Sequence, residues 1–312
     1  MSIGSILLVM QILALSTNGC SMNNSAESPM DQYAENDYTP LIWRATAPDG
    51  RYIYLFGAIH IAAEGLYPLP EVIMSAFYDS DYLAVEVNIN EKTNENDLEA
   101  ITELTTYKDG RTVKDEIGIE LYTRAKEAVI SRSPGFPLTI YDYHKPLSWV
   151  SLLDKIVIDD SGLSTDYGIE RYFLDKAHEH GIEVLSVESV LMQVEALYGL
   201  TLQTQITALE VSLDNLENIN DATRNMTAMY LNWVSGNEHE LETFMHDSFA
   251  KLGEEYYNSV VLNRNVHMAE TAIRYMAEEK KVFFVVGVGH LIGAGGIIDI
   301  LDQEGYTVSK IS

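Results

Sequence analysis

The sequence is poor in cysteine and in basic residues, and it has no hydrophobic run long enough to cross a membrane comfortably. Its single cysteine, Cys20, excludes an intramolecular disulfide and any cysteine-rich zinc or iron–sulfur site. Lysine and arginine number 20 against 47 aspartates and glutamates, which gives a formal net charge of −27. So acidic a chain repels phosphate backbones, and nucleic acid is not expected among its partners. With 46% hydrophobic residues, the composition is otherwise typical of a globular protein.

Motifs of several enzyme classes are also missing. The chain contains no H-E-x-x-H, no G-x-S-x-G and no P-loop sequence. Gly287, Gly289 and Gly293 have the spacing G-x-G-x-x-x-G, and the strand expected after them offers no ribose-binding acid. We therefore expect no dinucleotide site.

The N-terminal residues indicate export. Residues 3–15 are mostly apolar and are followed by Gly19-Cys20, an arrangement that resembles a bacterial lipoprotein signal ending at the lipidated cysteine. The match is incomplete, because no basic residue precedes the apolar run. We expect a signal segment at 1–20, lipidation of Cys20 and a flexible acidic tether at 21–38. The protein would then be extracytoplasmic, either anchored to the membrane through its N-terminal lipid or secreted. The alternative is an uncleaved, buried N-terminal element with a chance cysteine.

Beyond residue 38, apolar strands alternate with helices. The turn signal Pro48-Asp49-Gly50 predicts a hairpin near the start of this region. Strands are expected at 41–45, 51–56, 81–87, 182–187, 282–286 and 306–311, and helices at 70–78, 168–180, 262–277 and 296–303. This order predicts a single α/β domain at 39–312 with a largely parallel central sheet and an N-terminal hairpin. Helical insertions near 95–160 and 190–262 would cap the sheet.

Two segments repeat one pattern, IYLFGAIH at 53–60 and FFVVGVGH at 283–290. In each, an apolar strand leads to glycine (Gly57, Gly287) and, three residues later, to histidine (His60, His290). Given 20 glycines and 8 histidines, about half a G-x-x-H is expected by chance, and a third occurrence at 236–239 follows no strand. Because ligands of open α/β sheets bind at the carboxyl ends of strands, both imidazoles are expected in one crevice. The alternative for each histidine is a hydrogen-bonded structural role.

Two carboxylates end apolar strands in the same way. Glu86 ends DYLAVEV and Glu188 ends IEVLSVE, where a charge is costly unless it is paired or bound to a metal. Two imidazoles with one or two carboxylates suit a divalent ion, Mn²⁺, Co²⁺ or Zn²⁺, that activates water for hydrolysis. We assign Glu188 with His60 and His290 as metal ligands and Glu86 as the base. The alternative is that both carboxylates are solvated or cap the helices that follow.

The segments that carry these residues resemble the TraB/PrgY/GumN family, whose animal relatives include the TIKI Wnt-processing metalloproteases. The similarity spans residues 41–311, and it is carried by LIWRATAPDGRYIYLFGAIH, LPEVIMSAFYDSDYLAVEVN, DYGIERYFLDKAHEHGIEVLSVESVLMQ, LNRNVHMAE and VFFVVGVGHLIGAGGIIDILDQEGYTV. The resemblance implies a fold related to the ChaN and erythromycin-esterase group. It also implies that Arg264 lines the site with the four residues above, and it places Asp166 and Gln193 in matching motifs.

Arg264 receives two conflicting expectations. On helix 262–277 it lies opposite the apolar stripe of residues 262, 266, 269, 273 and 276, so the helical pattern predicts a surface arginine. The family resemblance instead turns it inward, as a clamp for a substrate carboxylate or oxyanion.

We expect a metal-dependent hydrolase whose substrate is a peptide or another small extracellular molecule. The alternatives are a non-catalytic protein that binds or sequesters a pheromone-like peptide, and an accessory protein for surface polysaccharide.

Overall fold

The computed structural model describes residues 38–311. The predicted signal segment, Cys20 and all but the last residue of the predicted tether lie outside the described residues.

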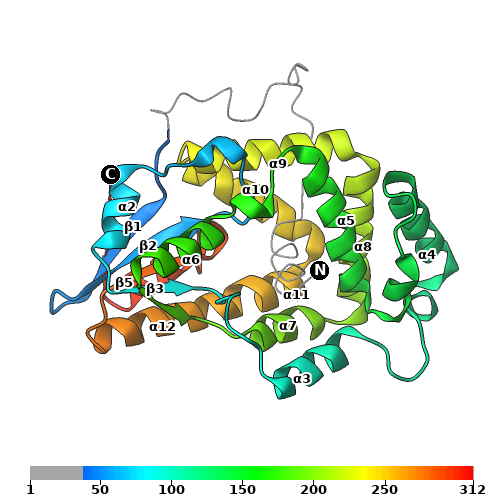
Figure 1. Cartoon of the computed structure of the whole chain (residues 1–312), viewed down its shortest axis with the longest axis horizontal. Helices are drawn as coiled ribbons and strands as arrows, with labels where there is room; N and C mark the ends of the chain where they lie inside the picture. Colours follow the sequence, from blue (N-terminus) through cyan, green and yellow to red (C-terminus); the bar gives the residue numbers. More distant parts are fainter. Residues whose placement is uncertain (1–37, 312) are drawn as a thin grey trace.

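A six-stranded sheet with the order β4-β3-β5-β2-β1-β6 forms one side of the described region (Figure 1). Its strands are β1 (Ile42–Thr46), β2 (Tyr52–Ala58), β3 (Tyr82–Val85), β4 (Glu183–Ser186), β5 (Val282–Gly287) and β6 (Thr307–Lys310). They agree with the six predicted strands to within three residues at each end, and the expected α/β class is confirmed.

The sheet is mixed, so the expectation of a largely parallel sheet is only partly correct. The pairings β4–β3, β3–β5 and β5–β2 are parallel, whereas β1 pairs antiparallel with both β2 and β6. The predicted hairpin explains the difference, because a tight turn can join only antiparallel strands. In that turn Gly50 has φ +91° and donates its N–H to Ala47 O over 2.9 Å.

Four helices cover the sheet, namely α2 (Glu71–Tyr78), α6 (Ile169–His180), α12 (Asn263–Ala277) and α14 (Ile297–Gln303). Successive residues of β5 face opposite sides, as the pleat of a strand requires. Phe283 packs against Phe77 of α2 and Phe173 of α6, while Phe284 packs against Tyr275 of α12. β5 is buried along its whole length, so the parallel part of the sheet lies in the middle of the core.

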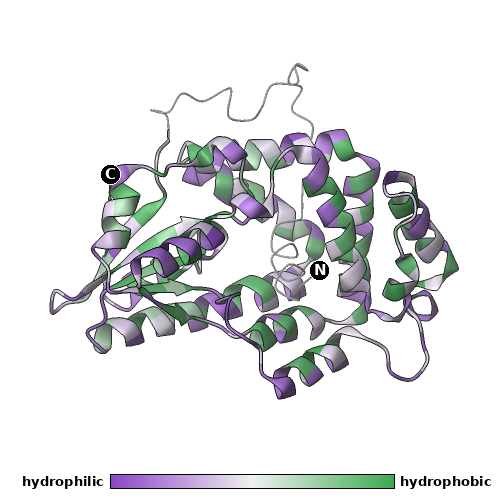
Figure 2. Ribbon diagram, in the orientation of Figure 1, coloured by the Kyte–Doolittle hydropathy of each residue, from purple (hydrophilic) through white to green (hydrophobic). Residues whose placement is uncertain are grey.

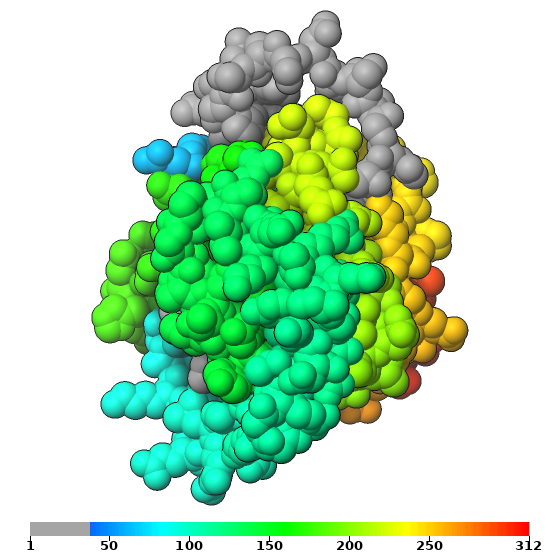
Figure 3. Space-filling view, turned by 90° about the vertical axis from the view of Figure 1, so that its right-hand side faces the viewer, coloured from blue at the N-terminus to red at the C-terminus, as the bar shows by residue number. Residues whose placement is uncertain are grey.

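Most of the remaining helices, which fall largely in the two stretches expected to be helical insertions, build a lobe beside the sheet. They are α3 (Glu95–Thr105), α4 (Val113–Arg132), α5 (Pro146–Ser161), α7 (Val190–Tyr198), α8 (Leu202–Glu217), α9 (Ile219–Val234), α10 (Glu238–Leu252), α11 (Glu254–Tyr257) and the π-helical turn η5 (Asn258–Leu262). Teal to green segments, α3 to α5, form much of the side facing away from the sheet (Figure 3).

Sheet and lobe share one hydrophobic core, which runs from Leu41 to Leu301 and includes Trp149 and Trp233 of the lobe. Hydrophobic residues lie along the strands and on the inner sides of the helices (Figure 2). Within residues 38–311 no helix is both long enough and apolar enough to cross a membrane.

Candidate functional site

The four residues predicted at strand ends lie at one edge of the sheet. Glu188 follows β4, Glu86 follows β3, His290 lies on the short helix α13 (Val288–Leu291) after β5, and His60 follows β2. These four strands are adjacent and parallel, so their carboxyl ends meet at the same edge. The backbone joins the two acids, since Glu188 N donates to Glu86 O over 2.9 Å. All four residues are buried.

Arg264 of α12 links the two carboxylates. Its Nη2 donates to Glu86 Oε2 over 2.6 Å and to Glu188 Oε2 over 2.7 Å, and its Nε lies 3.0 Å from Glu188 Oε1. Gln193 of α7 adds a second link, because its Nε2 donates to Glu86 Oε2 over 3.2 Å and to Glu188 Oε2 over 3.1 Å. The two acids are thus held together by buried donors.

These contacts keep Glu86 ionised although it is buried. Burial by itself would raise the pKa of Glu86, but the Arg264 guanidinium and the neighbouring imidazoles hold that pKa well below its usual range. The backbone N–H of Gly287 also donates to Glu86 Oε1 over 2.7 Å. Glu86 is therefore a carboxylate at neutral pH.

Each imidazole is oriented through its Nδ1 atom. His290 Nδ1 lies 2.6 Å from Asn265 Oδ1, and the Asn265 amide is fixed because its Nδ2 donates to Gly295 O over 2.8 Å. His60 Nδ1 lies 3.0 Å from Glu170 Oε2. Since both partners are acceptors, Nδ1 of each ring carries a proton, and Nε2 is the atom that can bind a metal when the ring is neutral.

The two rings differ in their affinity for a proton. Burial, helped by the Arg264 cation, lowers the pKa of His290 to about 3, so this ring is neutral. Burial also acts to lower the pKa of His60, but the Glu170 carboxylate outweighs it and raises that pKa.

Two glycines keep this edge of the sheet compact. A Cβ atom on Gly287 would lie 3.3 Å from Glu86 Oε1, 3.6 Å from His60 Nε2 and 3.6 Å from His290 Cδ2. Gly287 thus marks the point where the two imidazoles and Glu86 come together. On β2, a Cβ atom on Gly57 would lie 2.9 Å from Val288 Cγ2, so the absence of a side chain lets α13 approach the sheet.

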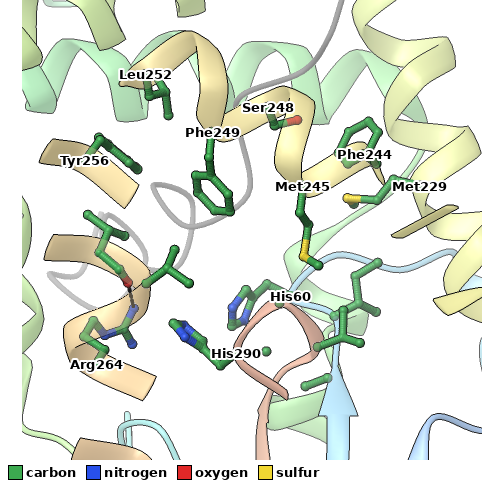
Figure 4. A pocket seen from close by; sticks show the side chains of 17 residues that line it. His60, Met229, Phe244, Met245, Ser248, Phe249, Leu252, Tyr256, Arg264 and His290 are labelled. Atoms are coloured by element: carbon green, nitrogen blue, oxygen red, sulfur yellow. Dashed lines mark hydrogen bonds between the residues drawn. The ribbon is translucent and has the colours of Figure 1, made fainter. Parts of the chain in front are cut away.

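A cavity of about 110 Å³ lies over the imidazoles. Figure 4 shows Met245 and Phe249 of α10 projecting toward His60 and His290, with Phe244 and Met229 beside them. Most of the lining is apolar, and its polar groups include His60, His290 and Arg264. The sheet edge provides the polar floor of the cavity, and the helical lobe provides its apolar walls.

The donor set suits a divalent cation in type and in charge. Three carboxylates (Glu86, Glu188, Glu170) and one guanidinium (Arg264) leave a formal charge of −2 when both imidazoles are neutral. Within residues 38–311, however, no three histidine, cysteine, aspartate or glutamate side chains form a ready-made metal-binding group. Arg264 and Gln193 engage the carboxylate oxygens instead.

The other predicted site residues divide into buried and exposed ones. Arg264 is only 6% exposed, so the surface position expected from the helical pattern is wrong and the inward position implied by the resemblance is correct. The pattern misled because α12 is buried over a broad face: Val266 of the predicted apolar stripe is 50% exposed, while Met268 is fully buried. Gln193 belongs to the cluster, whereas Asp166 is exposed and pairs with Arg171.

Two residues of the cluster had no role in the sequence-based prediction. Glu170 and Asn265 orient the imidazoles, yet each lies on a helix that is distant in sequence from its histidine. The sequence offers no clear signal for either residue, because the burial of Glu170 in an otherwise apolar helix face is visible only in the fold.

The cluster defines a class of α/β protein with two imidazoles and buried carboxylates at the carboxyl ends of parallel strands. The sequence profile of the TraB/PrgY/gumN family matches residues 41–310, so this chain belongs to that family.

Among its relatives, metalloprotease TIKI2 of Xenopus tropicalis is 24% identical over 300 residues, covering 82% of this chain and 57% of that protein. The TIKI2 metalloprotease of Danio rerio is also 24% identical, and the match covers 88% of this chain and 61% of that protein. The uncharacterized protein YbaP of Escherichia coli is 21% identical and is covered over 94% of its length. The chain thus spans little more than half the length of these TIKI proteins. No solved structure matches it.

Proposed function

We propose that this protein is a divalent-metal-dependent hydrolase that cleaves peptides. The observation that carries the proposal is the pair of buried imidazoles, each oriented through Nδ1 by an acceptor, beside an ionised buried carboxylate. Such acceptors behind metal-binding histidines are a general feature of metal sites. Similarity to proteins named metalloproteases supports the same reaction class.

His60 and His290 are the proposed ligands, with one carboxylate as the third. The sequence pattern assigns that position to Glu188, but both Glu188 oxygens accept hydrogen bonds from the Arg264 side chain, whereas Glu86 Oε1 accepts from the backbone N–H of Gly287 and not from Arg264. Glu86 instead faces both imidazoles, and a carboxyl with so low a pKa is a weak proton acceptor but a good anionic ligand. We therefore propose Glu86 as the third ligand and Glu188 as the acid that anchors Arg264.

When bound, Mn²⁺, Co²⁺ or Zn²⁺ would supply Lewis acidity and lower the pKa of a water molecule. The chain's own residues would hold the imidazoles in one tautomer and exclude bulk water through the apolar walls. Arg264 keeps Glu86 charged and adds a positive charge near the reacting group. The proposed setting is extracytoplasmic, with the chain tethered through a lipid on Cys20.

A non-catalytic peptide-binding protein is the alternative function. One observation favours it: Arg264 and Gln193 already bind the carboxylate oxygens that a metal would need. In that case the cluster is a structural ion pair beneath a binding cavity.

Peptide hydrolysis by the purified protein separates the two functions. We expect cleavage of a mixed peptide library that EDTA abolishes and that Mn²⁺, Co²⁺ or Zn²⁺ restores. His290→Ala should reduce the rate at least about a hundredfold, whereas His178→Ala, an exposed histidine on α6, should leave it unchanged. Hydrolysis that is insensitive to EDTA and to His290→Ala would contradict the enzyme assignment.

A further inference from the structure

The cavity above the imidazoles has the size of one side chain. An apolar cavity of about 150 Å³ accommodates benzene, and this one measures about 110 Å³. It therefore has room for a leucine, isoleucine or methionine side chain, but tryptophan exceeds it. Apart from the Ser248 hydroxyl, the walls away from the sheet edge are apolar and carry no charge, so a buried carboxylate or ammonium would be disfavoured there.

Arg264, the cation on the cavity wall, is already engaged. Its Nε and Nη2 donate to Glu86 and Glu188, and its Nη1 donates to Val260 O over 3.2 Å. An acidic ligand side chain would have to compete with two buried carboxylates for this guanidinium. The apolar part of the cavity is thus the part that can select a ligand.

A groove of about 500 Å³ lies on the other side of Met245 and Phe249. These two residues, one helical turn apart on α10, line both the cavity and the groove, and so does Gly289. A Cβ atom on Gly289 would lie 2.8 Å from Met245 Sδ, so the methionine packs directly on the backbone that leads to His290. Met245 and Phe249 therefore form the partition between the cavity and the groove.

The groove carries negative charge at its exposed rim. Glu242 and Glu254 line it and are exposed, and the exposed His246 lies between them in sequence. Together with the net charge of −27 this favours a ligand with basic residues and disfavours an acidic one.

We propose that the cavity is a specificity pocket for one aliphatic side chain of an extended peptide whose neighbouring, basic residues lie in the groove. Met245 determines the size of the side chain that is accepted. The proposal rests on the proposed function in taking the ligand to be a peptide that reaches the imidazoles. To that function it adds the class of peptide, namely one that has an aliphatic residue next to lysine or arginine.

Binding of defined peptides to the full chain in EDTA tests this proposal without requiring hydrolysis. The probes are N-acetylated, C-amidated hexapeptides with leucine, alanine, aspartate or tryptophan at one central position, next to either two lysines or two glutamates. We expect the leucine peptide with lysines to bind roughly tenfold or more tightly than its alanine counterpart. The aspartate, tryptophan and glutamate-flanked peptides should bind more weakly still.

Two variants change the pocket in opposite directions. Met245→Ala should enlarge it and improve binding of the tryptophan peptide, while Val260→Phe should fill it and abolish the preference for leucine. Ile140→Ala, at a position 61% exposed, is the control and should change neither.

The outcomes separate this inference from the proposed hydrolase activity. A preference for leucine without any hydrolysis would support the pocket and contradict the enzyme. Hydrolysis without discrimination among leucine, alanine and aspartate would support the enzyme and overturn the pocket. Absence of saturable peptide binding would also overturn it, leaving the cavity to a small apolar ligand or to a second copy of the chain.

Discussion

Single residues decide the chemistry of this molecule because most of the charge at the site is buried. Glu86, Glu188 and Arg264 have no more than 6% of their surface exposed. Removing one member of such a group leaves another without its partner, which costs much more than losing a surface ion pair. The cluster therefore acts as one unit in which the Arg264 cation compensates the negative charge of the two acids.

Another buried acid, Asp154, lies on α5 in the helical lobe. It is 1% exposed, and neither of its carboxylate oxygens has a hydrogen-bond partner among the described residues. Burial raises the pKa of Asp154 well above its ordinary value, against a smaller opposing effect of Ser212. Burial, with a smaller contribution from Asp154, also raises the pKa of Tyr256.

Asp154 should make the folded state less stable as the pH rises. Because its folded-state pKa lies above the unfolded value, its favourable contribution is complete at low pH and is lost as the pH rises through the folded-state pKa. Asp154→Asn should therefore raise the free energy of unfolding by about 1–3 kcal/mol at pH 8, with a smaller gain at pH 5. Urea denaturation at both pH values measures this, with the exposed Asp160→Asn as the control. An equal effect at both pH values would contradict a raised pKa.

At the scale of elements, the site depends on how closely α13 approaches β2. His290 lies on this four-residue helix, and Gly57 of β2 leaves the space for Val288 beside it. Trp233 of α9 donates its indole N–H to Gly57 O over 2.8 Å, so the lobe also fixes this point of the strand.

Gly57→Ala should therefore displace α13 and impair the site. The added Cβ would lie 2.9 Å from Val288 Cγ2, and overpacking of this kind costs about 1–3 kcal/mol. We expect a lower free energy of unfolding in chemical denaturation and weaker metal retention. Because Val288→Ala removes the contacting methyl group, the double variant should recover part of both losses. If Gly57→Ala is as stable as the wild type, the close packing of α13 on β2 is wrong.

The strands and helices around the sheet were predictable from the sequence because their apolar periodicity is strong. The two G-x-x-H segments also placed His60 and His290 at the correct edge, since strand ends of a parallel sheet meet there. What could not be predicted was contact between distant helices. The roles of Glu170 and Asn265, the pairing of Arg264 with both acids and the apolar walls from α10 depend on how the helices pack on the sheet.

At the scale of the whole described region, the sheet and the helical lobe contribute different parts of the site. The sheet edge contributes the imidazoles and carboxylates, and α9, α10 and η5 contribute the apolar walls of the cavity. The net charge of −27 is expected to disfavour anionic ligands. For the N-terminal residues, outside the described part, an export signal remains a prediction from the sequence.

Cys20 should carry lipid in the native host. The apolar run that ends in Gly19-Cys20 predicts cleavage before the cysteine and acylation of the new N-terminus. Mass spectrometry of the protein isolated from membranes should find a lipidated Cys20 as the first residue, and Cys20→Ala should move the chain out of the membrane fraction. An intact, unmodified N-terminus from cells would refute the predicted anchor.

The central claim is that His60 and His290 hold one divalent metal ion between them, and metal analysis tests it most directly. Elemental analysis of the purified protein after incubation with Mn²⁺, Co²⁺ or Zn²⁺ and gel filtration should find about one ion per chain. His60→Ala and His290→Ala should each lose most of that metal while remaining folded, and His178→Ala should retain it. Metal content that is the same in all four proteins, or no bound metal in any of them, would contradict the account.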